Sequence, residues 1–120
     1  MSERKTERQI RYVGEGFVNE KITSETLFDR TGTPLDDEKV QKVPHYAKVV
    51  ETLNTNRVTH YIRIYQGIPL DPMGAYARRE RNLDTKYQRV SKNTFDLYLT
   101  YLKTNNSIYL TKAQRGMLND

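Results

Sequence analysis

Residues 57–65 (RVTHYIRIY) alternate between two sets of side chains, and this alternation restricts the fold more than any other feature of the chain. One set is mostly aliphatic, and the other is polar or aromatic. Because successive side chains of a β-strand point to opposite faces of a sheet, the alternation predicts a central strand with one buried face and one open face. The β-branched and aromatic residues favour the same structure. The buried face would carry Val58, His60, Ile62 and Ile64, and the open face Arg57, Thr59, Tyr61, Arg63 and Tyr65.

The C-terminal part of the chain has the periodicity of helices. Phe95, Leu99 and Leu102 recur at the i, i+4, i+7 spacing of an amphipathic helix, and Ser91 or Asn93 would cap its first turn. A preceding stretch and a following stretch have weaker helical patterns. We therefore expect C-terminal helices near residues 75–89, 92–103 and 108–118.

The N-terminal part predicts a short β-hairpin. Two runs with strand character, residues 10–13 and 17–18, flank a turn that contains Gly14 and Gly16. Glycine between such runs is typical of hairpin turns. Residues 1–9 are polar and lack periodicity, so we expect them to form an arm.

Two prolines divide the segment between the hairpin and the central strand. Pro34 follows Thr33 in the pattern of a helix start, with Thr as the cap and Pro in the first turn. Pro44 would begin a second helix, so we expect helices over residues 34–43 and 44–53. Together with a length of 120 residues, which is typical of one domain, these elements predict an α+β fold. Residues 1–9 would be a polar arm, and residues 10–120 a single small α+β domain.

The composition predicts a small core. Hydrophobic residues make up 36% of the chain, less than is usual for a globular domain, and the mean hydropathy is −0.85. No apolar run approaches the length of about 18 residues that a membrane-spanning helix needs. No basic segment followed by an apolar one marks a secretory signal. We therefore expect an intracellular protein or a component of a viral particle, neither secreted through a signal peptide nor spanning a membrane.

The composition also argues against several kinds of chemistry. The chain has no cysteine, which removes disulfides, thiol catalysis and sulfur-ligated metal sites. Its two histidines, His45 and His60, are too few for a multi-histidine metal site, and no Ser/His/Asp set can be assembled. We expect no cofactor, no bound metal and no intrinsic catalysis.

One short string resembles the active site of an enzyme superfamily. Residues 28–36 (FDRTGTPLD) are similar to the phosphorylation loop F-D-x-[DT]-G-T-L of the haloacid dehalogenases and P-type ATPases. The resemblance implies that Asp29 is a phosphoryl-accepting nucleophile beside Mg²⁺, at the end of a buried parallel strand. Pro34 stands where that family usually has Leu, and the residues before Asp29 are polar for a strand buried on both faces. The same string is typical of a turn closed by an Asp side chain with Gly32 at positive φ, and we favour the turn.

Positive charge is concentrated in one segment. The chain has 20 Lys and Arg residues against 15 Asp and Glu residues, a net charge of +5. Residues 78–92 (RRERNLDTKYQRVSK) hold six basic and two acidic residues, so four of the five net charges lie there. A local basic stripe is typical of a surface that contacts a polyanion. The alternative is a solvated helix face with charges of mixed sign.

The open face of the central strand is the strongest candidate binding surface. Tyrosine rings flanked by guanidinium groups form a stacking platform for unpaired bases, with phosphate pairing beside it. The basic segment would extend this surface. In the alternative, helices cover the face and the tyrosine rings pack inside. The candidate residues for binding nucleic acid or a protein partner are Arg57, Tyr61, Arg63, Tyr65, Arg78, Arg79, Arg81, Lys86 and Arg89.

Two functions are consistent with these features. The first is a non-enzymatic structural subunit of a larger assembly, such as a tailed-phage particle, that binds other subunits, further copies of itself among them. Its contacts would be the N-terminal arm and the Tyr/Arg-rich surfaces. Nine tyrosines supply amphipathic contact area, and neighbours would complete the stability of a small core. The second is a small basic nucleic-acid-binding module that uses the strand face and residues 78–92. We favour the first, and expect no membrane partner.

Overall fold

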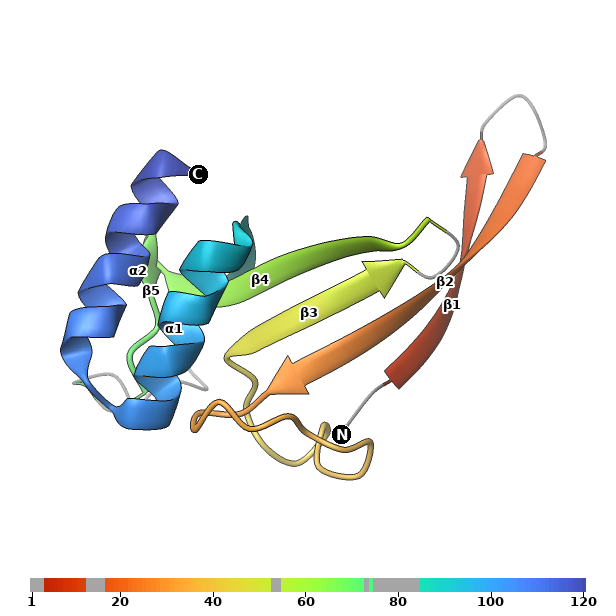
Figure 1. Ribbon diagram of the computed structural model, residues 1–120. Coiled ribbons are helices and arrows are strands. Elements are labelled where there is room, and N and C mark those ends of the chain that lie inside the picture. Colours follow the sequence, from red (N-terminus) through yellow and green to blue (C-terminus); the bar gives the residue numbers. More distant parts are fainter. Residues whose placement is uncertain (1–3, 13–16, 53–54, 73, 75–84) are drawn as a thin grey trace.

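The computed structural model describes residues 4–12, 17–52, 55–72, 74 and 85–120 (Figure 1). Among these residues, six strands form one antiparallel sheet and two helices follow it, so the predicted α+β class is confirmed. The elements in chain order are β1 (Arg4–Tyr12), β2 (Phe17–Phe28), β3 (Ala47–Thr52), β4 (Arg57–Tyr65), β5 (Ile68–Pro69), β6 (Lys86–Val90), α1 (Lys92–Thr104) and α2 (Ser107–Asn119).

Strand β4, predicted from its alternation, is the centre of the sheet. The order β1-β2-β3-β4-β5 runs along one path, and β6 also pairs with β4. The N–H of Arg63 donates to Tyr46 O at 2.9 Å, and its C=O accepts from Leu70 N at 3.0 Å. The N–H and C=O of one strand residue point to the same side, so β3 and β5 share one edge of β4. Strand β6 pairs with residues 60–64 along the opposite edge.

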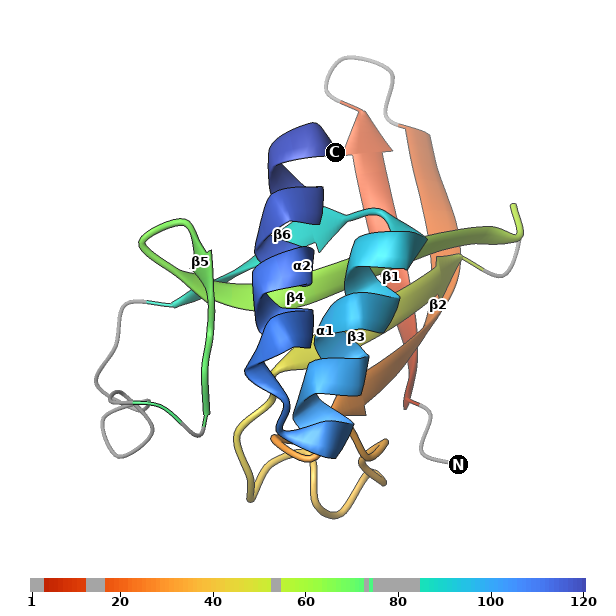
Figure 2. The ribbon, with the colours of Figure 1, turned by 60° about the vertical axis from the view of Figure 1, so that its left-hand side comes forward.

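The two helices cover the face of the sheet to which Ile62 and Ile64 point (Figure 2). Both isoleucines are buried, as the alternation predicts, but Val58, which was predicted to lie on the same buried face, is 45% exposed. The ring of Phe95 on α1 lies 5.7 Å from the ring of Phe28 and 5.0 Å from that of His60. Helix α1 supplies most of the helical side of the core, and α2 packs beside α1. The buried helical residues are Thr94, Phe95, Tyr98, Tyr101, Leu102 and Ala113.

The two C-terminal helices begin and end close to the predicted positions. Ser91 is the N-cap of α1, and its Oγ accepts from Thr94 N at 3.1 Å. Asn105 ends the helix with φ of 58°, and its N–H donates to Tyr101 O at 2.7 Å. A short polar side chain tolerates this left-handed conformation, so a local signal fixes each end of α1.

The two helices lie close together at Gly116 of α2. A Cβ atom at this position would collide with Thr94 Oγ1 and lie 3.4 Å from Thr94 Cβ. Asp120, which follows α2, accepts from Ser91 N at 3.0 Å and from Thr94 Oγ1 at 3.4 Å. The end of α2 therefore contributes to the capping of α1.

Several sequence predictions are wrong. The segment expected as a helix over 44–53 contains strand β3, because pairing with β2 and β4 on both sides outweighs its helix-like spacing. Residues 37–42 form turns rather than a helix. The helix expected over 75–89 is contradicted at its end, where Lys86–Val90 form β6 against the free edge of β4. The remainder of that helix, 75–84, lies outside the described residues.

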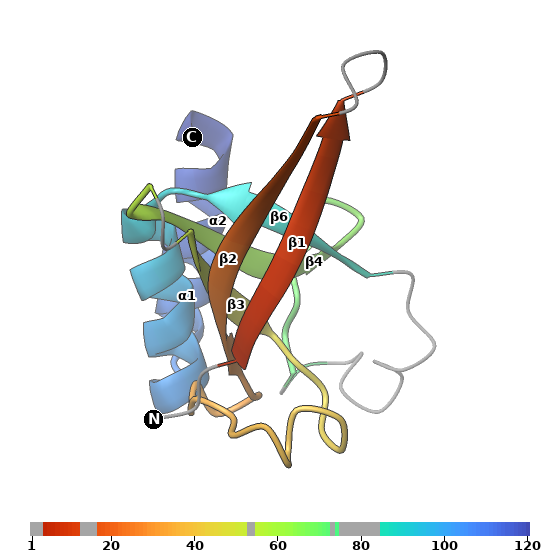
Figure 3. The same ribbon diagram turned by 90° about the vertical axis from the view of Figure 1, so that its right-hand side faces the viewer.

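The N-terminal hairpin is longer than predicted and projects from the body (Figures 1 and 3). Arg4–Gln9, assigned from sequence to a polar arm, belong to β1 and pair with β2. Strand β3 pairs with β2 only over Thr23–Phe28. Among the described residues, the Phe17–Ile22 part of β2 therefore has β1 as its only partner and forms a two-stranded ribbon. The radius of gyration, 15.7 Å, exceeds the value of about 14 Å for a compact chain of this length.

No helix within the described ranges combines the length and the apolar character needed to cross a membrane.

Candidate functional site

The face of the sheet that points away from the helices carries the candidate binding groups (Figure 3). Residues 57, 59, 61 and 63 of β4 point to this face, because Ile62 and Ile64 beside them are buried under α1. In the sheet register, Tyr61 lies between Lys48 of β3 and Arg89 of β6. We expected the basic segment to extend the strand face. Tyr61 and Arg89 fit this expectation, because they are cross-strand partners.

Lys48 lies over two tyrosine rings of this face. Its Nζ is 5.1 Å from the ring centroid of Tyr61 and 4.6 Å from that of Tyr87. Cation–π contacts at this distance stabilise by about 0.5–1 kcal/mol each when exposed. The ammonium group thus occupies part of the ring surface on which a base would have to stack.

Tyr87 is partly exposed, but its hydroxyl oxygen is buried. Its hydroxyl oxygen has no hydrogen-bond partner among the described residues. Burial raises the pKa of this hydroxyl well above its usual range; the positive charge of Arg63 opposes the shift, and the negative charge of Glu25 adds to it. Tyr87 therefore keeps its proton at neutral pH, and its hydroxyl is out of contact with solvent.

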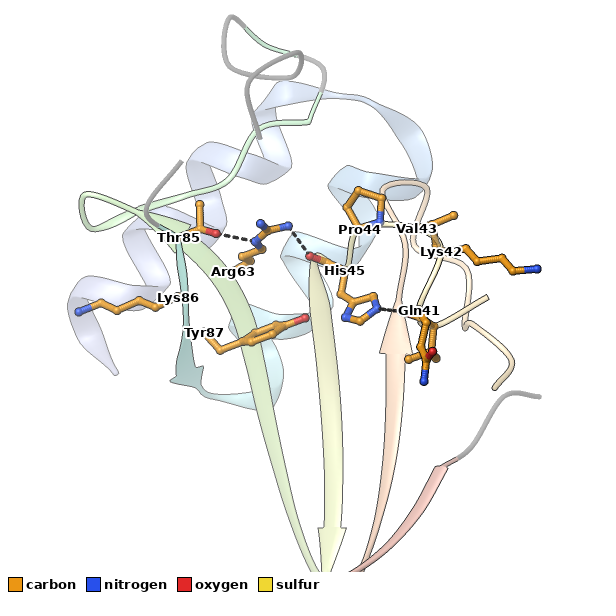
Figure 4. Close-up of a pocket in the computed structure, with 10 residues that line it drawn as sticks. Gln41, Lys42, Val43, Pro44, His45, Arg63, Thr85, Lys86 and Tyr87 are labelled. Carbon is orange, nitrogen blue, oxygen red and sulfur yellow. Dashed lines mark hydrogen bonds between the residues drawn. The ribbon is translucent and has the colours of Figure 1, made fainter. Parts of the chain in front are cut away.

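Arg63 is held in place by neutral groups. Its Nε donates to Thr85 Oγ1 at 2.7 Å, and its Nη1 donates to the backbone C=O of His45 at 3.0 Å (Figure 4). The guanidinium carbon is 5.6 Å from the ring centroid of Tyr46. A guanidinium group has five N–H donors, and within the described part of the chain these two bonds fix its position without neutralising its charge.

The segment that links β2 to β3 folds back over one end of this face. Leu35 N donates to Leu27 O at 2.8 Å, and a small apolar cluster forms from Leu27, Leu35 and Val40, with Val43 against it. Beside this cluster lies a pocket of about 650 Å³. It lies between the linking segment, β4 and the start of β6 (Figure 4). Its lining residues are Val40, Gln41, Lys42, Val43, Pro44, His45, Arg63, Thr85, Lys86 and Tyr87.

The other candidate residues have different surroundings. Arg57, Lys86 and Arg89 are exposed. Tyr65 is half-buried and lines a second, smaller cavity of about 280 Å³ with Leu70 and Leu110, so it does not continue the row of tyrosines. The remaining three, Arg78, Arg79 and Arg81, lie outside the described residues.

Sequence reasoning missed Lys48 and the role of Tyr87. Both lie in segments that were expected to be helical, so their pairing with β4 was not foreseen. The β-branched content of residues 49–52 (VVET) was a signal for the strand that carries Lys48.

The string that resembles a phosphorylation loop forms the expected turn. Asp29 Oδ1 accepts from Thr31 N at 2.8 Å and from Thr33 N at 3.1 Å, and Gly32 has φ of 76°. The preceding strand, β2, pairs antiparallel with both neighbours, whereas the resemblance implies a parallel strand. Asp29 thus organises the turn through its own backbone neighbours.

The site contains cationic side chains, aromatic rings and a pocket, which are features of a binding surface. Within the described part of the chain, no cluster of three or more His, Asp or Glu side chains is arranged to hold a metal ion. Comparison of the chain with protein-family models, with curated proteins and with solved structures gives no match.

Proposed function

We propose that this protein is a non-enzymatic subunit of a larger assembly and binds neighbouring subunits through the β1–β2 ribbon and the Tyr/Arg-rich face of β4 and β6. The ribbon is the observation that carries the proposal. Two-stranded ribbons are at best marginally stable in water, and an edge strand is a template for pairing with another chain. A neighbour that pairs with β1 or packs on the ribbon would supply the missing stability.

The open face of the sheet supports the same function. Tyrosine and arginine are enriched at protein interfaces, where they combine apolar area with hydrogen bonding. Here Tyr61 lies between Lys48 and Arg89 on the face that the helices leave uncovered. A small, cysteine-free subunit of this composition suits a virion-like particle, such as that of a tailed phage, whose parts are held together by many such contacts.

The first test is the association of the isolated chain. Thr6, in the middle of β1 and opposite Thr23, is replaced by proline, which lacks the N–H and is poorly tolerated in a ladder. Thr6→Ala is the matched control. In sedimentation velocity, the wild type and Thr6→Ala should gain mass as concentration rises, whereas Thr6→Pro should stay monomeric with an unchanged helical circular-dichroism signal. Three monomeric proteins at every concentration would contradict association of copies through the ribbon.

Nucleic-acid binding is the second candidate, and the positive charge around Tyr61 favours it. With about four phosphate contacts, log K for a single-stranded oligonucleotide should fall by roughly 3 per decade of salt. Tyr61→Ala should weaken binding by about 1–3 kcal/mol if a base stacks there, whereas Arg89→Gln should lower the salt dependence. The contact of Lys48 with the Tyr61 ring argues for the first candidate. Tight, salt-sensitive binding that is lost in Tyr61→Ala would reverse this preference.

A further inference from the structure

We propose that the outer edge of β6 binds an extended acidic segment of a different subunit, which adds to the sheet as a further strand. The inference rests on the proposed function, because β6 belongs to the surface named there, and it specifies the chemistry of one neighbour. Three observations carry it: the direction of the backbone groups of β6, the charge of β6, and the faces to which its cationic side chains point.

The backbone groups of alternate β6 residues face away from β4. Arg63 directs its N–H and C=O to the side of β3 and β5. Because these directions alternate along a strand, Ile62 directs its own groups to β6, where Gln88 is its partner. The N–H and C=O of Tyr87 and Arg89 therefore point outward. No backbone hydrogen bond among the described residues uses them, so they form an open sheet edge.

An open edge of this kind is a template for an extended chain. Main-chain groups of the added chain pair with the outward N–H and C=O groups, which supplies affinity, and its alternate side chains supply specificity. Strand β6 has only five residues, Lys86–Val90. Because few backbone bonds can form along so short a strand, the side chains have to decide which partner is accepted.

The charge of β6 favours an acidic partner. Its sequence, KYQRV, has two basic residues and no acidic one, and Lys86 and Arg89 are both exposed. Like charges on neighbouring strands oppose pairing. Strand β1, with four basic residues and one acidic residue in RKTERQIRY, is therefore a poor partner, and so is β6 of a second copy. An acidic segment has the complementary charge.

The two cations of β6 lie on opposite faces of the sheet. Arg89 is the cross-strand partner of Tyr61 and shares its open face. Lys86 is three residues away, and side chains an odd number of positions apart point to opposite faces. Figure 4 shows the side chain of Lys86 pointing away from Arg63 and from β4. A matching segment therefore has two acidic residues three positions apart, one for each face.

The first test measures the affinity of the full chain for a short peptide. The fluorescently labelled probe has eight residues, in which valine and threonine alternate except for two glutamates three positions apart. The control peptide has lysines in place of the glutamates. By fluorescence anisotropy, the glutamate peptide should bind at least about ten times more tightly than the control. No binding of the glutamate peptide, or equal affinity of the two peptides, would overturn the proposal.

Two substitutions at Arg89 separate its charge from its outward N–H. Arg89→Gln removes the charge and should weaken peptide binding by about threefold. Arg89→Pro also removes the N–H, and should weaken it by at least about tenfold. Proline is tolerated on an edge strand where the N–H faces outward, so the circular-dichroism signal should not change. Arg30→Gln, at an exposed arginine in the turn after β2, should leave affinity within about twofold. Equal weakening by both Arg89 variants would exclude strand addition.

Hydrogen exchange gives a second test that needs no variant. In the free protein, the amides of Tyr87 and Arg89 should exchange rapidly and that of Gln88, which faces β4, slowly. Saturating glutamate peptide should slow Tyr87 and Arg89 by at least about tenfold. If the peptide binds but slows neither amide, it does not bind at the β6 edge and the proposal is wrong.

The remaining outcomes separate this proposal from the assembly through the ribbon. Thr6→Pro should bind the glutamate peptide as the wild type does. Peptide binding without ribbon association would support this proposal and contradict the ribbon, and ribbon association without peptide binding would do the reverse. Loss of self-association in Arg89→Pro would assign the edge to a second copy. A single-stranded oligonucleotide that displaces the peptide and binds more tightly would assign it to nucleic acid. Either of these last two results would overturn the proposal.

Discussion

Replacing Gly116 by alanine should destabilise this protein, although alanine is the better helix former. In an exposed helix the change is worth about 1 kcal/mol in favour of alanine. Here the new methyl group would collide with Thr94 Oγ1 and lie 3.4 Å and 3.6 Å from Thr94 Cβ and Cγ2. Thr94 is 1% exposed, and its hydroxyl bonds to Ser91 Oγ at 3.1 Å and to Asp120 Oδ1 at 3.4 Å. The side chain therefore cannot move aside without losing these bonds.

The magnitude follows from two opposing contributions. Overpacking of a closed contact costs about 1–3 kcal/mol, and the gain in helix propensity offsets about 1 kcal/mol of it. Gly116→Ala should thus lower the free energy of unfolding by about 1 kcal/mol. In a Thr94→Ala background both γ atoms are gone and only the contact with Cβ remains, so the same change should stabilise by up to about 1 kcal/mol. The coupling between the two positions is then about 2 kcal/mol.

Urea unfolding followed by far-ultraviolet circular dichroism measures all four members of this cycle. Thr94→Val is the matched control, since it removes the hydroxyl bonds and keeps two γ atoms near Gly116. In that background Gly116→Ala should still destabilise. If Gly116→Ala instead stabilised the wild type by the full 1 kcal/mol, α1 and α2 would not approach each other at this point.

Three further predictions concern single side chains. Burial lowers the folded-state pKa of His60, and the positive charge of Lys92 lowers it further. The wild type should therefore lose stability as the pH falls below 6.5, because the unfolded state then binds the proton more readily. His60→Gln should lack this loss. Partial burial raises the pKa of Asp120, but its bonds from Ser91 and Thr94 outweigh this and lower it. The Asp120 carboxylate should therefore stabilise the fold above about pH 4, and this stabilisation should be lost as the pH falls through its lowered pKa. Asp120→Asn should lack this pH dependence. Tyr98→Phe removes the buried bond to Leu70 O, 2.7 Å long, and should cost about 1–2 kcal/mol in urea unfolding.

Local signals were sufficient for β4, α1 and α2. The two-residue alternation of β4 and the i, i+4, i+7 spacing in α1 each need only one neighbouring layer, so the sequence pattern matches the burial of Ile62, Ile64, Phe95 and Leu102, although Val58 at the start of β4 is exposed. The caps at Ser91 and Asn105 act within one turn of their own positions. These elements depend on residues close in sequence, and they were predicted with nearly correct bounds.

Strands β3 and β6 could not be identified in the same way. The spacing of Tyr46, Val49 and Val50 fits a helix, and the strand forms because β2 and β4 supply partners on both edges. Residues 86–89 are mostly polar and were assigned to a helix, but Lys86–Val90 pair with the outer edge of β4. Such pairing is a property of the whole sheet, and tertiary context overrides local preference.

The candidate site could be predicted only in part, for the same reason. Tyr61 and Arg63 were placed correctly on the open face, because their strand was. The pairing of Tyr61 with Arg89, the position of Lys48 over two rings, and the bonds that hold Arg63 all involve segments whose structure depends on non-local contacts. The sequence therefore indicated the chemistry of the surface but not the pocket beside it.

Hydrogen exchange of the ribbon tests the central claim most directly, since the claim is that the ribbon needs a neighbouring subunit. Amides of residues 7–12 and 17–22 are compared with those of residues 60–64 in β4, first in dilute, monomeric protein and then under conditions of association. Ribbon amides should exchange much faster than those of β4 in the monomer and slow by at least about tenfold on association. Ribbon amides already as protected as those of β4 in the monomer would contradict the account.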